Sequence, residues 1–246
     1  MVRDPVCLME VDPRRAAAMV EHAGLTFYFC SESCKRRFLD HPQQFIDKAP
    51  GMRLTLGVMG SASGNLPREA NEKAYALGQA IGKRGLILIT GACPGLPYEC
   101  ARGVRDQGGL SVGISPALSL DEHIHKYLSP SDVYDVLIYT GSGLMGREVT
   151  NIHSSDMVVI LGGRSGTLGE FAIAYDEGKL IGVLEGTGGI TEQISGIVEG
   201  IDKDTGARLI FESDPEALLG KLLESYTASH YKRPSCFCDE LPAAAG

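Results

Sequence analysis

Short apolar runs alternate with stretches of helical periodicity from residue 53 to residue 226. Residues 67–84 place Ala70, Ala74, Leu77 and Ile81 at helical spacing, and a second helix is predicted over 98–107. The apolar runs are 54–59, 86–90, 110–115, 133–140, 157–161, 180–184 and 208–211. Most lack the alternation of a half-exposed strand, which is typical of strands buried on both faces of a parallel sheet. The pattern therefore predicts an α/β fold with a doubly wound parallel sheet.

Glycine-rich loops follow five of these predicted strands, in residues 57–64, 91–95, 141–143, 162–167 and 186–189. Ligands bind beyond the carboxyl ends of the strands in such sheets. Glycine lets backbone N–H groups approach an anion closely, so we expect a phosphate pocket at this edge. The alternative is that the glycines only form tight turns. The candidate ligand-binding residues are Gly60, Ser61, Gly91, Gly143, Gly162, Gly163, Arg164, Ser165, Gly166 and Thr167.

The loop at 162–170 carries the most specific pattern, because it ends one strand and begins a helix. Thr167 is predicted to cap that helix or to bind a phosphate oxygen. Glu170, one turn later, could hold ribose hydroxyls or act on a water, or it could simply favour the helix dipole. Arg164 is a second candidate phosphate contact, since a guanidinium suits phosphate, or else a surface loop residue.

These motifs resemble those of the LONELY GUY family, within the wider SLOG group of Rossmann-like proteins. Residues 166–170 match the GTxxE motif, and Arg147 lies nine residues before Asp156, as the arginine of MHxRK does in the family. The resemblance covers about 53–226 and implies a Rossmann-like fold. It also implies cleavage of the N-glycosidic bond of nucleoside 5′-monophosphates. Arg147 would then contact phosphate or stabilise the reacting centre, and Glu170 would hold ribose and help to position water.

The sequence also departs from that family. Gly162-Gly163-Arg164 stands where the family has PGG, and Met145 and Glu148 stand at its histidine and lysine positions. The body looks closer to a branch grouped with DNA-processing and molybdenum-cofactor-carrier proteins. The leading hypothesis is therefore binding of a phosphorylated nucleotide or nucleotide-bearing cofactor. The alternatives are the phosphoribohydrolase and a carrier of a molybdopterin-type cofactor or of metal. The resemblance further implies a homodimer or larger homo-oligomer.

Residues 1–50 carry a second candidate site. They contain Cys7, Cys30 and Cys34, and the last two lie one helical turn apart if a helix begins at Ser31. Three thiolates suit zinc or another soft or borderline metal such as copper, and metal would stabilise so small a unit. The segment resembles a YHS domain. Candidates for a fourth ligand are Asp4, Met9 and His22, or a group from a partner or ligand. The alternative is three buried free cysteines.

Composition narrows the function further. The chain has 246 residues and a formal net charge of −8. The seven basic and seven acidic residues of 1–50 cancel, so the whole charge lies in 51–246, which argues against general nucleic-acid binding. No apolar run reaches the roughly 18–20 residues of a membrane span, and the charged N-terminus is unlike a signal peptide, so we expect a cytoplasmic protein.

The domain boundaries and the remaining cysteines complete the prediction. Pro50-Gly51 marks a boundary. We expect a metal module at 1–50, the nucleotide-binding domain at 51–228 and a flexible tail at 229–246. Cys93 and Cys100 are predicted to pack in the core, and Cys236 and Cys238 form a C-x-C pair in the tail.

Overall fold

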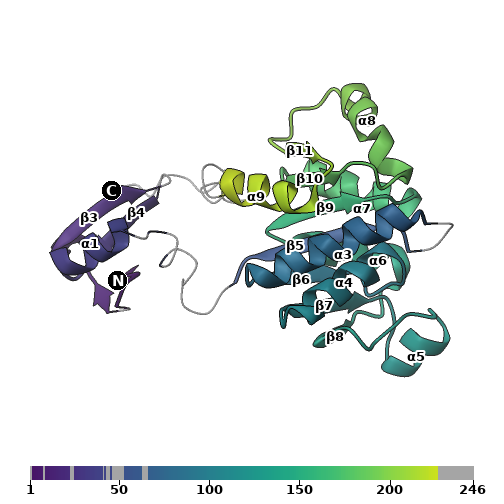
Figure 1. Ribbon diagram of the computed structural model, residues 1–246, viewed down its shortest axis with the longest axis horizontal. Helices are drawn as coiled ribbons and strands as arrows, with labels where there is room; N and C mark the ends of the chain where they lie inside the picture. Colours follow the sequence, from purple (N-terminus) through teal and green to yellow (C-terminus); the bar gives the residue numbers. More distant parts are fainter. Residues whose placement is uncertain are drawn as a thin grey trace. The chain divides into compact units, whose positions relative to one another are not determined.

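The computed structural model divides the chain into two compact units (Figure 1), which we treat separately. The structure describes residues 2–7, 9–22, 25–40, 42, 45, 53–62 and 66–226. The smaller unit holds the described residues up to Arg53, and the larger holds those from Leu54 to Tyr226. None of the helices in these ranges is long and apolar enough to cross a membrane.

The smaller unit is built from two short sheets and one helix. Strands β1 (Val2–Arg3) and β2 (Glu10–Val11) pair antiparallel, and a 3-10 turn, η1 (Pro13–Arg15), follows them. Strands β3 (Ala18–His22) and β4 (Leu25–Phe29) form the antiparallel hairpin, and α1 (Glu32–Asp40) comes next. Phe29 and Phe38 are fully buried with their ring centroids 5.2 Å apart. This aromatic contact holds the helix against the hairpin.

The larger unit confirms the predicted α/β fold. Its seven strands are all parallel and lie in the order β11-β10-β9-β5-β6-β7-β8. They are β5 (Thr55–Gly60), β6 (Ile87–Thr90), β7 (Leu110–Ser115), β8 (Val136–Tyr139), β9 (Met157–Leu161), β10 (Leu180–Leu184) and β11 (Arg208–Glu212). The chain runs outward from β5 to β8 and then returns to the other side of β5, so the topological switch point lies between β5 and β9.

Helices cover both faces of this sheet (Figure 1). One core layer joins the sheet to α3 (Arg68–Lys83), α4 (Leu96–Asp106) and α9 (Pro215–Ser225). The other joins it to α6 (Gly143–His153), α7 (Ser165–Asp176), η2 (Gly189–Gln193) and α8 (Ile194–Ile201). The short helix α5 (Leu120–His125) follows β7. Two apolar layers explain why β9 and β10 are buried at every position.

Helices α3 and α4 pack unusually closely because of two glycines. A Cβ on Gly78 would lie 2.0 Å from the carbonyl oxygen of Cys100, and one on Gly103 would lie 2.2 Å from that of Tyr75. Only glycine fits at either position. This contact fixes the start of α4, which lies beside the pocket described below.

Two strand boundaries depend on aspartate side chains. The apolar run at 133–140 forms a strand only over Val136–Tyr139, because the carboxylate of Asp135 accepts the backbone N–H of Ser111 at 2.7 Å. Asp156 does the same for Thr55 at the start of β5, also at 2.7 Å. Each carboxylate takes the place of a backbone acceptor at the amino end of the sheet. The carboxyl end, where the sequence predicts ligand binding, lies opposite.

Candidate functional site

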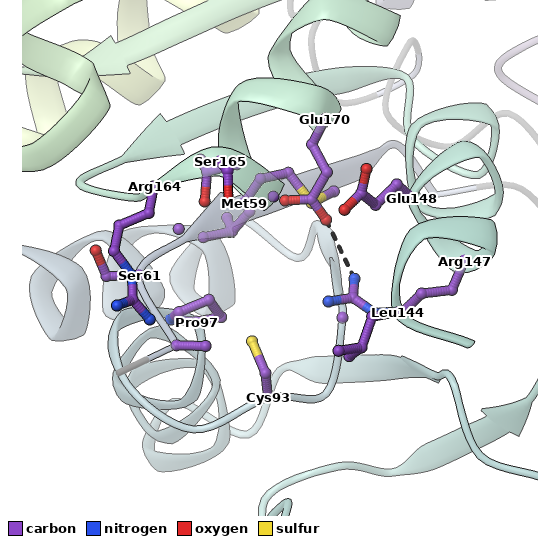
Figure 2. A pocket seen from close by; sticks show the side chains of 16 residues that line it. Met59, Ser61, Cys93, Pro97, Leu144, Arg147, Glu148, Arg164, Ser165 and Glu170 are labelled. Atoms are coloured by element: carbon purple, nitrogen blue, oxygen red, sulfur yellow. Dashed lines mark hydrogen bonds and ion pairs between the residues drawn. The ribbon is translucent and has the colours of Figure 1, made fainter. Parts of the chain in front are cut away.

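A cavity of about 350 Å³ opens at the switch point, within the volume range of small-molecule sites (Figure 2). It lies beyond the carboxyl ends of β5 and β9, where the sequence predicts ligand binding. Its lining consists of Val58, Met59, Gly60, Ser61, Ala62, Gly91, Cys93, Pro97, Leu144, Arg147, Glu148, Arg164, Ser165, Gly166, Thr167 and Glu170.

Three helices begin at this cavity. Pro97 lies in the first turn of α4, Leu144 in that of α6, and Ser165 begins α7. None of the three N-termini is capped by a side-chain hydrogen bond, whereas Ser119 caps α5 and Asp214 caps α9. At α4 the N–H of Leu96 donates to the Ser61 carbonyl oxygen at 2.9 Å and Pro97 has no N–H, and at α6 the N–H of Gly143 donates to the Pro116 carbonyl oxygen at 3.3 Å. The partial positive charge of the three helix ends still makes the cavity suit an anionic group.

The loops around the cavity are tied to one another. Gly163 donates its N–H to the Ser61 hydroxyl at 2.6 Å, and Gly162 donates to the Thr187 hydroxyl at 2.8 Å. Both glycines have positive φ, and a Cβ on Gly163 would lie 2.4 Å from that of Thr167. Glycine is therefore required to shape the turn into α7, although neither residue lines the cavity.

Arg147 and Glu170 meet inside the cavity, although they are 23 residues apart. The guanidinium Nη1 donates to Glu170 Oε1 at 3.1 Å, and both side chains are at most 10% exposed. Asn151, one turn after Arg147, donates its amide to the same oxygen at 3.1 Å. Burial raises the pKa of Glu170, and Arg147 and Asn151 oppose that rise without cancelling it.

Glu148 is a second carboxylate in the cavity. Its residue is 6% exposed, and its carboxylate has no hydrogen-bond or ion-pair partner in the described part of the chain. Burial raises its pKa, the nearby Glu170 charge adds to that rise, and Arg147 opposes it. The cavity thus combines three helix N-termini with two carboxylates.

Most of the residues predicted for the ligand site come together here. The cavity is lined by Arg147, Glu170, Gly60, Ser61, Gly91, Arg164, Ser165, Gly166 and Thr167. Gly143, Gly162 and Gly163 stand behind its surface or at a helix start. Thr167 does not cap α7, because the helix begins at Ser165 and Arg164 occupies the N-cap position.

Sequence reasoning missed several residues of the site. Cys93, predicted to pack in the core, lines the cavity, and burial raises the pKa of its thiol to about 11. Cys100 is fully buried, as expected of a packing residue. Asn151 could have been found from its i+4 spacing after Arg147, which places both side chains on one helix face. Glu148 was recognised only as a departure from the family's lysine.

The smaller unit gathers a candidate metal centre. Ligand atoms of Asp4, Cys7, Cys30 and Cys34 all lie within 4.8 Å of one another. The sulfurs of Cys30 and Cys34 are 3.8 Å apart, and those of Cys7 and Cys30 are 3.3 Å apart. Two sulfurs that each lie about 2.3 Å from one tetrahedral zinc ion are about 3.8 Å apart, so the donor set fits a thiolate metal.

Asp4 connects the two cysteine-bearing segments. It is fully buried, and its oxygens accept N–H groups of Val6 and Cys30 at 2.8 Å each, and of Cys7 at 3.3 Å. Burial acts to raise its pKa, but these donors outweigh it and the pKa is lowered. Asp4 and Cys7 raise the pKa of the Cys30 thiol to about 12, so a bound metal must displace its proton.

The other fourth-ligand candidates are Met9 and His22. Met9 is 59% exposed, and the His22 ring packs edge-on against Phe38 with centroids 5.7 Å apart. His22 does not belong to the group of neighbouring ligand atoms around Cys30. Cys236 and Cys238 lie outside the described residues.

Sequence comparison matches both units to known families. The model of the SLOG cluster4 family matches residues 53–219, and that of the YHS domain matches residues 2–49. The predicted resemblances to the SLOG group and to YHS domains are thereby confirmed. A protein of Archaeoglobus fulgidus, described as uncharacterized, is 35% identical over 132 residues, or 54% of this chain and 80% of its own.

A second relative matches only the N-terminal region. A copper-transporting P-type ATPase of Rhizobium leguminosarum bv. viciae is 39% identical over 46 residues, which are 19% of this chain and 6% of the ATPase. The chain therefore spans a small fraction of that transporter's length.

Solved structures resemble the larger unit. The molybdenum cofactor binding protein of Rippkaea orientalis is 27% identical, with a TM-score of 0.57 over 71% of this chain and 98% of its own. The molybdenum cofactor carrier protein of Chlamydomonas reinhardtii is 28% identical, with a TM-score of 0.57 over 70% and 99%.

Proposed function

The chain belongs to the SLOG cluster4 family and carries an N-terminal YHS domain, and on that premise we propose that the larger unit binds a small phosphorylated cofactor, of nucleotide or molybdopterin type, in the switch-point cavity. The observation that carries this proposal is the convergence of three uncapped helix N-termini on one cavity that also contains two arginines. Such an arrangement supplies anion-binding groups that the chain's net charge of −8 does not.

Binding and delivery fit this cavity better than turnover does. Glu170 is held by Arg147 and Asn151 in the absence of ligand, which limits its freedom to position water. The resemblance to molybdenum cofactor binding and carrier proteins, at 27% and 28% identity, favours a pterin-bearing cofactor as cargo. Arg164 and the first turn of α7 would hold its phosphate.

Native mass spectrometry of the purified protein, followed by identification of the released small molecule, tests this proposal. A phosphorylated pterin or nucleotide in stoichiometric amount is expected. Arg164→Ala should lose the ligand, and Arg68→Ala, which changes a side chain 92% exposed on α3, should retain it. Titration calorimetry that detects no binding of any nucleotide or pterin phosphate would contradict the proposal.

Hydrolysis of nucleoside 5′-monophosphates is the second candidate, and the presence of the Glu170 carboxylate on the cavity wall favours it. An oxocarbenium-like transition state is stabilised by a nearby carboxylate. Release of free adenine from AMP, abolished in Glu170→Ala, would support this activity. Nucleotide binding without base release by the wild-type protein would rule it out.

For the smaller unit we infer a site for zinc or copper at Cys7, Cys30 and Cys34, with Asp4 beside them. When bound, the metal would crosslink a unit with little apolar core. Elemental analysis should find about one metal per chain. Cys34→Ser should lose it, and Cys93→Ser, which removes a thiol from the larger unit, should not. A metal-free wild-type protein purified without chelators would contradict the inference.

We also propose that the protein is a cytoplasmic homodimer or larger homo-oligomer. Apolar side chains that are 46% to 75% exposed support an interface, since monomers rarely leave many such groups in water. They lie on the edge strand β8 and at the start of α6, and they are Val136, Ile138, Leu144 and Met145. Light scattering at micromolar concentration measures the oligomeric state, and a monomer would contradict this part of the proposal.

A further inference from the structure

Glu148 is a carboxylate in the cavity for which the described part of the chain supplies no hydrogen-bond donor. Its residue is 6% exposed, and Figure 2 shows its oxygens directed into the pocket beside Glu170. Arg147, the adjacent residue, is hydrogen-bonded to Glu170 instead, at 3.1 Å. The Glu148 oxygens do not belong to the sealed side-chain atoms that lack a partner, so a ligand in the cavity can reach them and supply donors.

The start of α7 is shaped to make room for this carboxylate. A Cβ on Gly169 would lie 2.7 Å from Glu148 Oε2, and one on Gly166 would lie 3.4 Å from Oε1. Any larger side chain at position 169 would push the carboxylate aside. The two glycines therefore allow the Glu148 carboxylate to lie beside α7 at the wall of the cavity.

The charges in the cavity divide it into two ends. Arg164, Ser61 and Ser165 lie on one side in Figure 2, and Glu148 and Glu170 lie on the other. A phosphate group is attracted to the Arg164 side of the cavity and repelled by Glu148. A phosphate held at Arg164 therefore leaves the Glu148 side to the part of the ligand farthest from phosphate, which in a nucleotide or pterin cofactor is the heterocycle.

A carboxylate with two free oxygens accepts two parallel N–H donors. The 2-amino-4-oxo ring edge of guanine or of a pterin offers that pair, as a ring N–H beside an amino group. Adenine offers an amino donor beside a ring acceptor, which the carboxylate repels. Hypoxanthine offers the ring N–H without the amino group.

We propose that Glu148 recognises the ligand through the paired N–H donors of a 2-amino-4-oxo heterocycle, so that the cavity selects guanine- or pterin-type ligands against adenine. This inference rests on the proposed function, since it assigns a ring to the cofactor bound there. It makes Glu148 a specificity-determining residue, distinct from the Arg147–Glu170 pair.

Titration of the full-length protein with GMP, IMP and AMP tests the inference. GMP is expected to bind roughly tenfold to a hundredfold more tightly than AMP, with IMP between them, as for other bidentate base contacts. Glu148→Gln should lose this preference and shift toward AMP, because glutamine presents one acceptor and one donor. Glu72→Gln, on a side chain 60% exposed on α3, serves as the matched control and should keep it.

A structural role for Glu148 predicts different results. If the carboxylate only supported the fold, Glu148→Gln would lower the unfolding temperature and weaken all three nucleotides alike. If Glu148 instead acts on the ligand, Glu148→Gln should leave the unfolding temperature of the ligand-free protein nearly unchanged. Equal binding of AMP and GMP by the wild-type protein, or a preference unchanged in Glu148→Gln, overturns the inference alone. Failure of all three nucleotides to bind also overturns the inference, and the proposed function fails with it only if a pterin phosphate does not bind either.

Discussion

Replacement of Arg147 by methionine should destabilise the larger unit in a pH-dependent way. The variant keeps an unbranched side chain in the cavity wall but leaves Glu170 with only the Asn151 hydrogen bond. Both members of the pair are at most 10% exposed. Removal of one partner from a buried ion pair costs about 3–5 kcal/mol, and the remaining hydrogen bond places our expectation near the lower value.

The pH dependence follows from the pKa of Glu170. Burial raises that pKa above its ordinary value, and Arg147 opposes the rise. A carboxyl group with a raised pKa in the folded state destabilises that state as pH rises from the unfolded pKa through the folded one. Loss of Arg147 raises the folded pKa further, and about 3 kcal/mol corresponds to about two pKa units. The loss of stability should therefore be smallest near pH 5 and grow as the pH rises toward 8.

Urea unfolding at pH 5, 6, 7 and 8 measures this effect, followed by far-UV circular dichroism because the chain has no tryptophan. Arg102→Met is the matched control, because Arg102 pairs with Glu99 at 2.9 Å while 43% exposed and should cost at most about 1 kcal/mol. The double variant Arg147→Met with Glu170→Gln should recover most of the loss. A loss of equal size at pH 5 and pH 8, or a double variant as unstable as the single one, would refute the reasoning.

Three further predictions concern other parts of the chain. Cys34→Ser should lose bound metal, which elemental analysis measures. In calorimetry the same variant should show a lower unfolding temperature of the smaller unit, and a chelator should lower that temperature no further. Gly78→Ala should destabilise the larger unit by about 1–3 kcal/mol, because the new methyl would lie 2.0 Å from the Cys100 carbonyl oxygen. Urea unfolding measures this, and an unchanged stability would contradict the close packing. Asp214→Ala removes the N-cap hydrogen bond to Ala217 at 2.7 Å and should cost about 1 kcal/mol in the same assay, and Asp214→Asn should recover most of it.

The strands of the sheet could be predicted from the sequence because a strand that is buried on both faces is a continuous run of apolar residues. Strands β9 and β10 are buried at every position, and their sequences are uninterrupted apolar runs. The run at 133–140 was less well predicted. Its first residues are not in the strand. The Ser111 N–H donates to the Asp135 side chain at 2.7 Å, and the Ser111 carbonyl accepts the Asp135 backbone N–H at 3.0 Å.

The metal cluster could also be predicted in part. Cys30 and Cys34 are one helical turn apart, so local geometry alone brings them together. The role of Asp4 is different, because it accepts the N–H of Cys30 from 26 residues away. No local pattern indicates which of Asp4, Met9 and His22 turns toward the sulfurs.

The sequence by itself determined the strands, the glycine-rich loops that follow them and the residue types available at one sheet edge. These properties are recorded locally, in the periodicity of burial and in the backbone freedom of glycine. Only the tertiary structure decided that Arg147 pairs with Glu170, that Asn151 shares the same oxygen and that Glu148 meets no donor among the residues the structure describes. Those relations depend on how α6 crosses α7, and two helices packed through long-range contacts leave no signature at a fixed spacing in the chain.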